Sequence, residues 1–228
     1  MDPLHAPVQH AGRYRGGIGR LPLPAALPWF RMGVADEPPL RALATWSGAI
    51  AGLLLILVGG LMPAAFPLPA PGGWILQPLG ITLQVPALLL TALVAGPRSA
   101  LLAAVAYLSV GLFQLPVFHE GGGLGYLLDP SFGYLAGFMP AAWLTGKLSR
   151  QSGVDDPLSL AVLAAFGLLI IHLCGLANLA LGSLAGRWGP AAMSLVLSYS
   201  LALLPQLLLC CAVGLLAWSL RRLLLVTT

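Results

Sequence analysis

Charged residues are scarce in this chain. Asp, Glu, Lys and Arg make up 8% of its 228 residues, against roughly a quarter in an ordinary soluble domain. Hydrophobic residues make up 58%, and the mean hydropathy is +0.91. These values exclude a soluble globular enzyme and a disordered chain, and they predict an integral membrane protein. The net charge of +4 does not indicate a nucleic-acid-binding protein, because most basic residues flank long apolar runs.

The motifs of common enzyme classes are missing as well. The chain has no GxxxxGK[ST], HExxH or GxSxG motif. No pair of carboxylates lies inside an apolar run, which disfavours a proton-driven pump. The cysteines lack CxxC or metal-ligand spacing, so we interpret them as small buried apolar residues: Cys174, Cys210 and Cys211. We therefore expect a small-molecule binder or permease subunit rather than an enzyme, with no metal and no cofactor.

Long apolar runs divide the chain into six segments. A bilayer core about 30 Å thick requires about 20 apolar residues in a helix, and lipid admits only helices and closed barrels. The chain does not show the alternating ten-residue strands of a barrel. We therefore predict an all-α, polytopic membrane domain at residues 41–222. Its six transmembrane helices are expected at Arg41–Met62, Ile81–Gly96, Ser99–Leu115, Ser131–Leu148, Leu158–Ala185 and Pro190–Leu220.

Basic residues are distributed unevenly between the two sides of this arrangement. Ten of the eleven fall at the chain ends or in the second and fourth connections, and only Arg187 falls on the other side. The positive-inside rule then predicts that both termini are cytoplasmic, in a multi-pass protein of the plasma (inner) membrane. Residues 1–40 are predicted to be a flexible basic tail that either contacts anionic lipid or is an inert extension. Residues 223–228 form a short C-terminal tail.

Two connections on the predicted outer side are too apolar for ordinary solvated loops. Residues 63–80 carry no charge and five prolines, and residues 116–130 contain a run of glycines. Because Gly and Pro permit sharp turns in little space, we predict that both connections fold back over the helix ends as a lid. The tip of the second connection is assigned a gating role, with a solvated His–Glu pair as the alternative: His119, Glu120, Gly121, Gly122 and Gly123.

An ordered series of short motifs occupies residues 80–138. It comprises Ile-Thr-Leu-Gln at 81–84, Gly-Pro-Arg at 96–98, Leu-Pro-Val-Phe at 115–118, the glycine run, and Asp-Pro-Ser-Phe-Gly-Tyr at 129–134. The series resembles the BioY family, the biotin-specific substrate-binding (S) components of energy-coupling factor (ECF) transporters. The resemblance implies six helices, a vitamin site near the outer face, and assembly with a transmembrane coupling protein and two ATPase subunits. Some members are thought to act without a dedicated module.

The resemblance also implies a docking stripe on the first helix, where the family carries small residues spaced by four. Ala44, Gly48 and Gly52 have this spacing. The family interpretation is docking on the coupling protein. The alternative is close packing against the protein's own helices, which small residues also favour.

The sixth segment departs from the family pattern. The family usually carries Pro-Gly-Asp there, followed three residues later by Lys, and both charged side chains are associated with the ligand. Here Pro205 is followed by Gln206, and Leu207 and Cys210 stand in place of the Asp and Lys. An amide can pair with a ureido ring in both directions but cannot supply a cation to a carboxylate. Biotin remains the predicted ligand. The alternatives are a paralogue for another small vitamin or precursor, and a non-transporting scaffold.

Polar and aromatic side chains in apolar surroundings are the candidate ligand contacts. An unpaired buried amide costs about 1–3 kcal/mol, so the amides require a ligand or a neighbouring backbone as partner. Aromatic rings could wall an apolar bicyclic ligand or simply pack in the core. The candidates are Gln84, Tyr107, Phe118, Tyr126, Tyr134, Asn178, Tyr199 and Gln206. We expect the ligand under the 116–130 loop, against the fourth to sixth segments, with Asn178 and Gln206 as its principal polar partners.

Overall fold

The computed structural model describes residues 38–113, 115–118 and 121–224. The expectations for the tail at 1–37, for His119 and Glu120, and for residues 225–228 lie outside this part. Most of the described chain is helical, in the order α1 (Pro38–Leu61), β1 (Pro63–Ala70), β2 (Gly73–Thr82), α2 (Gln84–Ala95), α3 (Pro97–Phe113), η3 (Leu124–Leu128), α4 (Phe132–Ala136), α5 (Phe138–Leu148), α6 (Pro157–Leu184), η4 (Gly189–Ala191), α7 (Ala192–Leu201) and α8 (Leu203–Leu223).

The prolines explain where several helices begin. Pro86, Pro140 and Pro205 each occupy the third residue of a helix, in α2, α5 and α8. The first turn of a helix has no intrahelical acceptor for its N–H groups, so a proline is tolerated there. The six predicted segments all contain helices, but the fourth is divided into α4 and α5, and the sixth into α7 and α8.

Three helical stretches in the described chain have the length and hydropathy to cross a membrane: residues 39–61, 157–184 and 193–223. Helices α2 and α3 are apolar but shorter, at 12 and 17 residues. A membrane protein is therefore supported, while the number of six spans remains a prediction.

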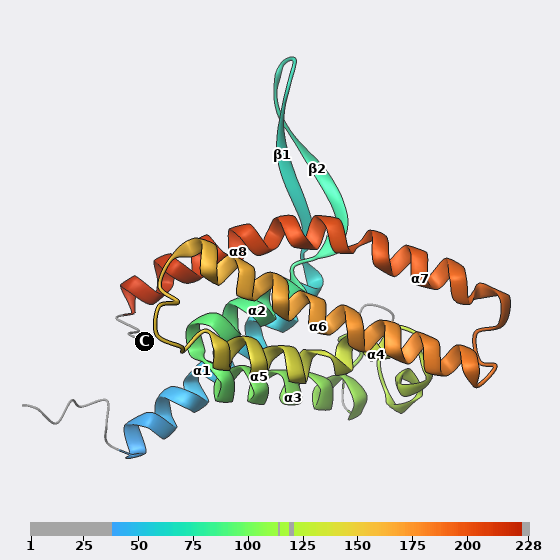
Figure 1. Cartoon of the computed structure of the whole chain (residues 1–228), viewed down its shortest axis with the longest axis horizontal. Helices are drawn as coiled ribbons and strands as arrows, with labels where there is room; N and C mark the ends of the chain where they lie inside the picture. The colour runs from blue at the N-terminus through green and yellow to red at the C-terminus, as the bar shows by residue number, and fades with distance from the viewer. Residues whose placement is uncertain (1–37, 114, 119–120, 225–228) are drawn as a thin grey trace, which may run out of the picture.

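Helix α2 lies at the centre of the bundle. It contacts α1, α3, α5, α6 and α8, and Figure 1 shows α8 running beside the N-terminal part of α6, with α7 continuing toward the other end of the molecule. One buried cluster lies around Tyr107 and Phe138, and a second lies around Leu89, Leu168 and Val213. Small residues allow the helices to approach closely. A Cβ placed on Gly52, for example, would overlap the side chain of Thr91.

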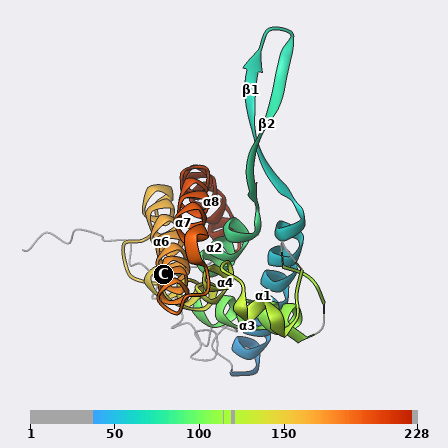
Figure 2. The ribbon, with the colours of Figure 1, turned by 90° about the vertical axis from the view of Figure 1, so that its right-hand side faces the viewer.

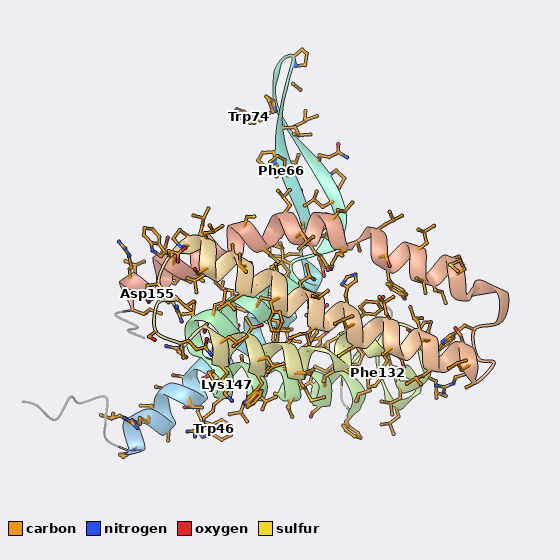
Figure 3. The ribbon with its side chains drawn as sticks, viewed as in Figure 1. Trp46, Phe66, Trp74, Phe132, Lys147 and Asp155 are labelled. Atoms are coloured by element: carbon orange, nitrogen blue, oxygen red, sulfur yellow. The ribbon has the colours of Figure 1, made fainter. Side chains whose placement is uncertain are left out.

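The connection at residues 63–80 differs from the prediction. It does not fold back as a lid but forms an antiparallel hairpin that projects away from the helices (Figures 1 and 2). Gly72 and Gly73 have φ values of 111° and 139°, which supply the tight turn. The strands pair with each other along their inner edges, and the base of β2 contacts α1 and α8. The all-α prediction is wrong at this hairpin, which leaves Phe66 and Trp74 exposed (Figure 3).

Candidate functional site

A cavity of about 230 Å³ lies between the base of the hairpin, the start of α2, α4 with the start of α5, the middle of α6, and the junction of α7 with α8. None of its lining residues is an Asp, Glu, Lys or Arg. They are Gly80, Ile81, Thr82, Gln84, Val85, Tyr126, Ser131, Tyr134, Leu135, Phe138, Ile171, His172, Tyr199, Ala202 and Gln206. The cavity therefore suits an uncharged, partly apolar ligand group.

Aromatic rings form one wall of the cavity. The Tyr134 ring lies 4.9 Å from the Tyr199 ring and 5.4 Å from the His172 ring, centroid to centroid. Tyr134 fits against α6 because Gly175 has no side chain, since a Cβ there would overlap the Tyr134 ring. The position of this wall thus depends on a single small residue in α6.

A second aromatic group supports the cavity from behind. The Phe118 ring lies 5.5 Å from Tyr107 and 4.7 Å from Tyr126. The Tyr107 hydroxyl donates to the Val117 carbonyl at 3.1 Å, and the Phe118 ring fills the space that Gly111 leaves. These contacts attach residues 115–118 to α3.

The residues after this segment are fixed by local hydrogen bonds. The Gly123 N–H donates to the Gly111 carbonyl at 2.8 Å, and the Ser131 hydroxyl donates to Asp129 at 2.6 Å. Tyr126 and Ser131 share a 2.7 Å hydrogen bond between their hydroxyl groups. Tyr126 is thereby held as one side of the cavity. The gating role of Gly121, Gly122 and Gly123 is untested and stays a prediction.

Unpaired polar atoms gather around the cavity. Six buried side-chain N or O atoms of the described chain lack a hydrogen-bond partner, and four belong to cavity-lining residues. They are Gln84 Nε2, the Tyr134 hydroxyl, His172 Nδ1 and Gln206 Oε1. A buried polar group without a partner costs about 1–3 kcal/mol. Four unpaired polar groups around one cavity are expected where a bound ligand supplies their missing hydrogen-bond partners.

His172 is the cavity residue whose protonation the structure defines best. Its side chain is 5% exposed, and its Nε2 lies 3.2 Å from the Tyr199 carbonyl oxygen. A carbonyl oxygen can only accept, so Nε2 carries the proton in the neutral ring. Nδ1 is then an acceptor without a partner.

Five of the eight predicted ligand contacts line the cavity: Gln84, Tyr126, Tyr134, Tyr199 and Gln206. Tyr107 and Phe118 lie in the core behind it. Asn178 is elsewhere on α6, where its Nδ2 donates to the Pro130 carbonyl at 3.1 Å. The neighbouring backbone is thus its partner in this structure.

Leu207 and Cys210 do not line the cavity either. Leu207 is exposed on the outside of the bundle, and Cys210 is buried in the cluster around Leu89. His172, by contrast, lines the cavity and was not among the predicted contacts. The signal for it was present, because an ionisable residue inside an apolar helix often marks a functional site.

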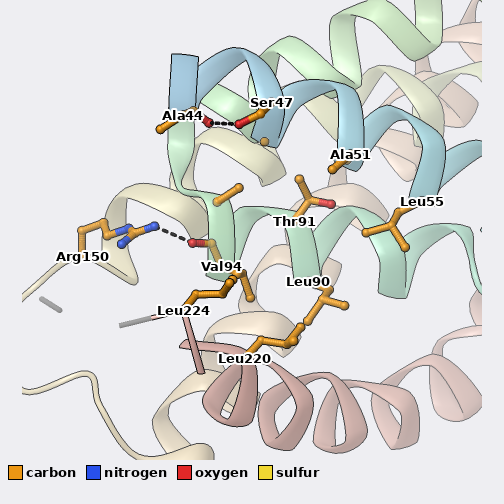
Figure 4. A pocket seen from close by; sticks show the side chains of 13 residues that line it. Ala44, Ser47, Ala51, Leu55, Leu90, Thr91, Val94, Arg150, Leu220 and Leu224 are labelled. Atoms are coloured by element: carbon orange, nitrogen blue, oxygen red, sulfur yellow. Dashed lines mark hydrogen bonds between the residues drawn. The ribbon is translucent and has the colours of Figure 1, made fainter. Parts of the chain in front are cut away.

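At the far end of α2, a groove of about 520 Å³ runs between α1, α2 and α8 (Figure 4). Small and aliphatic residues line most of it: Ala44, Ser47, Gly48, Ala51, Gly52, Leu55, Leu90, Thr91, Val94, Ala95, Leu220 and Leu224, together with Arg150. All three predicted docking residues lie here. Gly48 and Gly52 also pack closely on α2 and α3, so the internal-packing interpretation of the stripe has contacts to support it, and docking on a coupling protein stays a prediction.

Two arginines cap the C-terminal end of α2 beside this groove. Arg150 donates to the Val94 carbonyl at 2.7 Å, as Figure 4 shows, and Arg221 donates to the Leu93 carbonyl at 3.0 Å. Arg221 also donates to the carbonyls of Val154 and Ser149. Burial lowers the pKa of Arg150. The negative ends of α2 and α5 stabilise the half-buried Arg150 and the buried Arg221.

Comparison with known proteins indicates the family to which the chain belongs. The family model of the BioY family matches residues 37–225. A protein described as "Probable biotin transporter BioY" from Lysinibacillus sphaericus is 37% identical over 110 residues, which are 46% of this chain and 55% of that protein. "Biotin transporter BioY" from Thermotoga maritima is 35% identical over 114 residues, 44% of this chain and 66% of that protein. These alignments thus span about half to two thirds of the relatives.

A solved structure has the same fold. It is the crystal structure at 2.1 Å of the S-component for biotin from an ECF-type ABC transporter, with a TM-score of 0.62 and 19% sequence identity. The similarity covers 82% of this chain and 94% of that chain. From the family match over most of its length, the chain belongs to the BioY family.

Proposed function

We propose that this protein is the membrane substrate-binding subunit of a biotin uptake system. The observation that carries the proposal is the uncharged cavity with four unpaired polar atoms. Biotin combines an apolar bicyclic ring system with a ureido group that both donates and accepts hydrogen bonds. The aromatic wall suits the rings, and the unpaired atoms suit the ureido group. The biotin transporters among its relatives support the same ligand.

The proposal includes six spans across the plasma membrane. Both ends of the chain then lie in the cytoplasm. The start of α1 and the end of α8 lie at the same end of the molecule (Figure 1). Most basic residues of the described chain gather there, including Lys147 and Arg222, which lie over the rings of Trp143 and Trp218. Such basic and aromatic residues are typical of the cytoplasmic interface. The cavity would then face the outside.

The proposed partner is an ECF module of a transmembrane coupling protein and two ATPase subunits. The groove between α1, α2 and α8 is the proposed docking surface. It lies at the proposed cytoplasmic end, and its small residues would allow another helix to approach closely. Ala44 and Ala51 are the most informative of these residues, because they are exposed in the groove. Gly48 and Gly52 are also required for internal packing.

The direct test is equilibrium binding of labelled biotin to the purified full-length protein. Saturable binding at one site per chain is the expected result, and Gln206→Leu should weaken it by removing an unpaired acceptor from the cavity. Ser183→Ala is a matched control, because Ser183 lies on α6 outside the cavity and its hydroxyl bonds only its own helix. Absence of saturable binding to the folded wild type would reject the proposal.

A second candidate is a paralogue that binds another small vitamin or precursor. The observation that favours it is the loss of the family's Asp and Lys, whose positions carry Leu207 and Cys210 outside the cavity. Mass spectrometry of the small molecule that copurifies with the protein separates the two. Biotin supports the first candidate, and a different heterocycle supports the second.

A further inference from the structure

The unpaired atoms of the cavity can be sorted by the hydrogen bonds that each can make. Gln206 Oε1 can only accept, and Gln84 Nε2 can only donate. His172 Nδ1 accepts in the neutral ring, because Nε2 is the donor to the Tyr199 carbonyl. The Tyr134 hydroxyl can do either. The cavity thus offers two acceptors, one donor and one group of either kind.

A cyclic urea has the complementary pattern of two N–H donors and one carbonyl acceptor. We infer that the cavity recognises its ligand as a neutral cyclic urea, with His172 Nδ1 and Gln206 Oε1 accepting from the two N–H groups. Gln84 Nε2 then donates to the urea carbonyl. This inference rests on the proposed function and specifies how the same cavity achieves it. The four atoms are closed to solvent in the structure, so this recognition requires side-chain rotations that turn them toward the ligand.

The carboxylate of the ligand has no counterpart in this cavity. The lining contains no Lys or Arg, and a carboxylate buried without a partner carries a large desolvation cost. Arg150 and Arg221 are bound to carbonyls at the far end of α2. The acid end of the ligand therefore lies in water at the cavity mouth and contributes little to affinity. A ligand whose carboxylate is masked should bind as well as the free acid.

His172 makes this recognition sensitive to pH. The titratable groups around it are the phenol of Tyr134 on α4, whose ring lies 5.4 Å from the His172 ring, and the phenols of Tyr126 in η3 and Tyr199 on α7, which line the same cavity. No described carboxylate lines the cavity to favour the cation. Protonation would place N–H groups on both ring nitrogens and set Nδ1–H against a ligand N–H. Binding should therefore weaken as His172 becomes charged.

The experiment uses biotin and biotinamide, which keeps the urea but has no ionisable carboxyl group. At pH 7.5 the two are expected to bind wild type within about threefold of each other. Between pH 7.5 and pH 5.0, biotinamide affinity should fall by about threefold or more in wild type. In His172→Gln, whose amide oxygen restores an acceptor, binding should persist and no longer depend on pH. His172→Phe should weaken binding at pH 7.5 by about tenfold.

Several results would overturn the inference while leaving the proposed function intact. The first is that wild type binds biotin but has no affinity for biotinamide. The second is that the affinity of wild type for biotinamide rises at low pH. The third is that His172→Phe binds as tightly as wild type. Each variant is compared with Ser183→Ala and judged only where its thermal unfolding matches that control. If His172→Phe fails to fold, the pH series on wild type alone decides. Absence of binding of both ligands to folded wild type would overturn the inference and the proposed function together.

Discussion

The cavity and the groove lie at opposite ends of α2 and differ in what they leave unsatisfied. The cavity contains buried polar atoms without partners, surrounded by aromatic rings and without charge. At the groove, the charged groups Arg150 and Arg221 are bound to backbone carbonyls, and the exposed surface is apolar and made of small side chains. Unpaired polar atoms indicate a small polar ligand. A small-residue apolar surface in a membrane protein indicates contact with another helix.

The largest effect is expected from restoring the family's charged pair in α8. Leu207→Asp with Cys210→Lys would tighten biotin binding if these positions faced the cavity. Cys210 is instead 3% exposed, in the cluster around Leu89. A buried, unpaired Lys inside the membrane region is costly, so we expect loss of monodisperse protein in size-exclusion chromatography. A well-folded double variant with higher biotin affinity would contradict the assigned geometry of α8.

A large loss of stability is expected from Arg221→Met. This change leaves the carbonyls of Leu93, Val154 and Ser149 without their donor. Since each buried unsatisfied group costs about 1–3 kcal/mol, we expect destabilisation of at least about 3 kcal/mol and a clearly lower Tm. Arg222→Met is the matched control, because Arg222 is exposed and lies over the Trp218 ring. Equal Tm values for the two variants would show that capping at this end is unimportant.

An intermediate effect, confined to the cavity, is expected from Gly175→Val. The new side chain would displace Tyr134 from the aromatic wall. Overpacking of this kind costs about 1–3 kcal/mol, and where that strain falls on the aromatic wall it corresponds to biotin binding weaker by about fivefold to a hundredfold. Ala177→Val, at an exposed position of the same helix, should bind biotin like wild type. Equal biotin affinity of Gly175→Val and Ala177→Val would contradict the role assigned to the aromatic wall.

The smallest effect on the isolated protein is expected from Ala51→Leu in the groove. Ala51 is exposed, so stability and biotin binding should stay unchanged. Association with a coupling protein should be lost, because the larger side chain separates the helix backbones. Ile50→Phe enlarges an exposed neighbour outside the groove and should assemble normally. Normal copurification of Ala51→Leu with the coupling module would place the docking surface elsewhere.

Helix positions could be predicted well from the sequence, because hydropathy and prolines act locally. The segment expected at Leu158–Ala185 corresponds to α6 at Pro157–Leu184, and Asp156 caps its first turn through Ser159. The hairpin at residues 63–82 could not be foreseen. Its five prolines indicated an irregular loop, yet prolines are tolerated in strands that lie at a sheet edge. Both strands of a two-stranded hairpin are such edges.

Two polar residues on α6, His172 and Asn178, show why the residues that line the candidate cavity were only partly predicted from the sequence. His172 and Asn178 are six residues apart, about 240° around a helix of 3.6 residues per turn, so they cannot face the same side. Which of them faces the cavity depends on where Tyr134 and Pro130 pack against α6. Those contacts join segments far apart in the chain. The apolar pattern of α6 carries no information about them, because every face of this helix is apolar.

The central claim is that the cavity, and not the groove, binds biotin. Its most direct test is a titration of labelled biotin with wild type, Gly175→Val and Ala51→Leu, all confirmed as folded by thermal unfolding. The account predicts saturable binding to wild type and Ala51→Leu with equal affinity, and binding to Gly175→Val that is weaker by about fivefold or more. Unchanged binding in Gly175→Val, or loss of binding in Ala51→Leu, would contradict it.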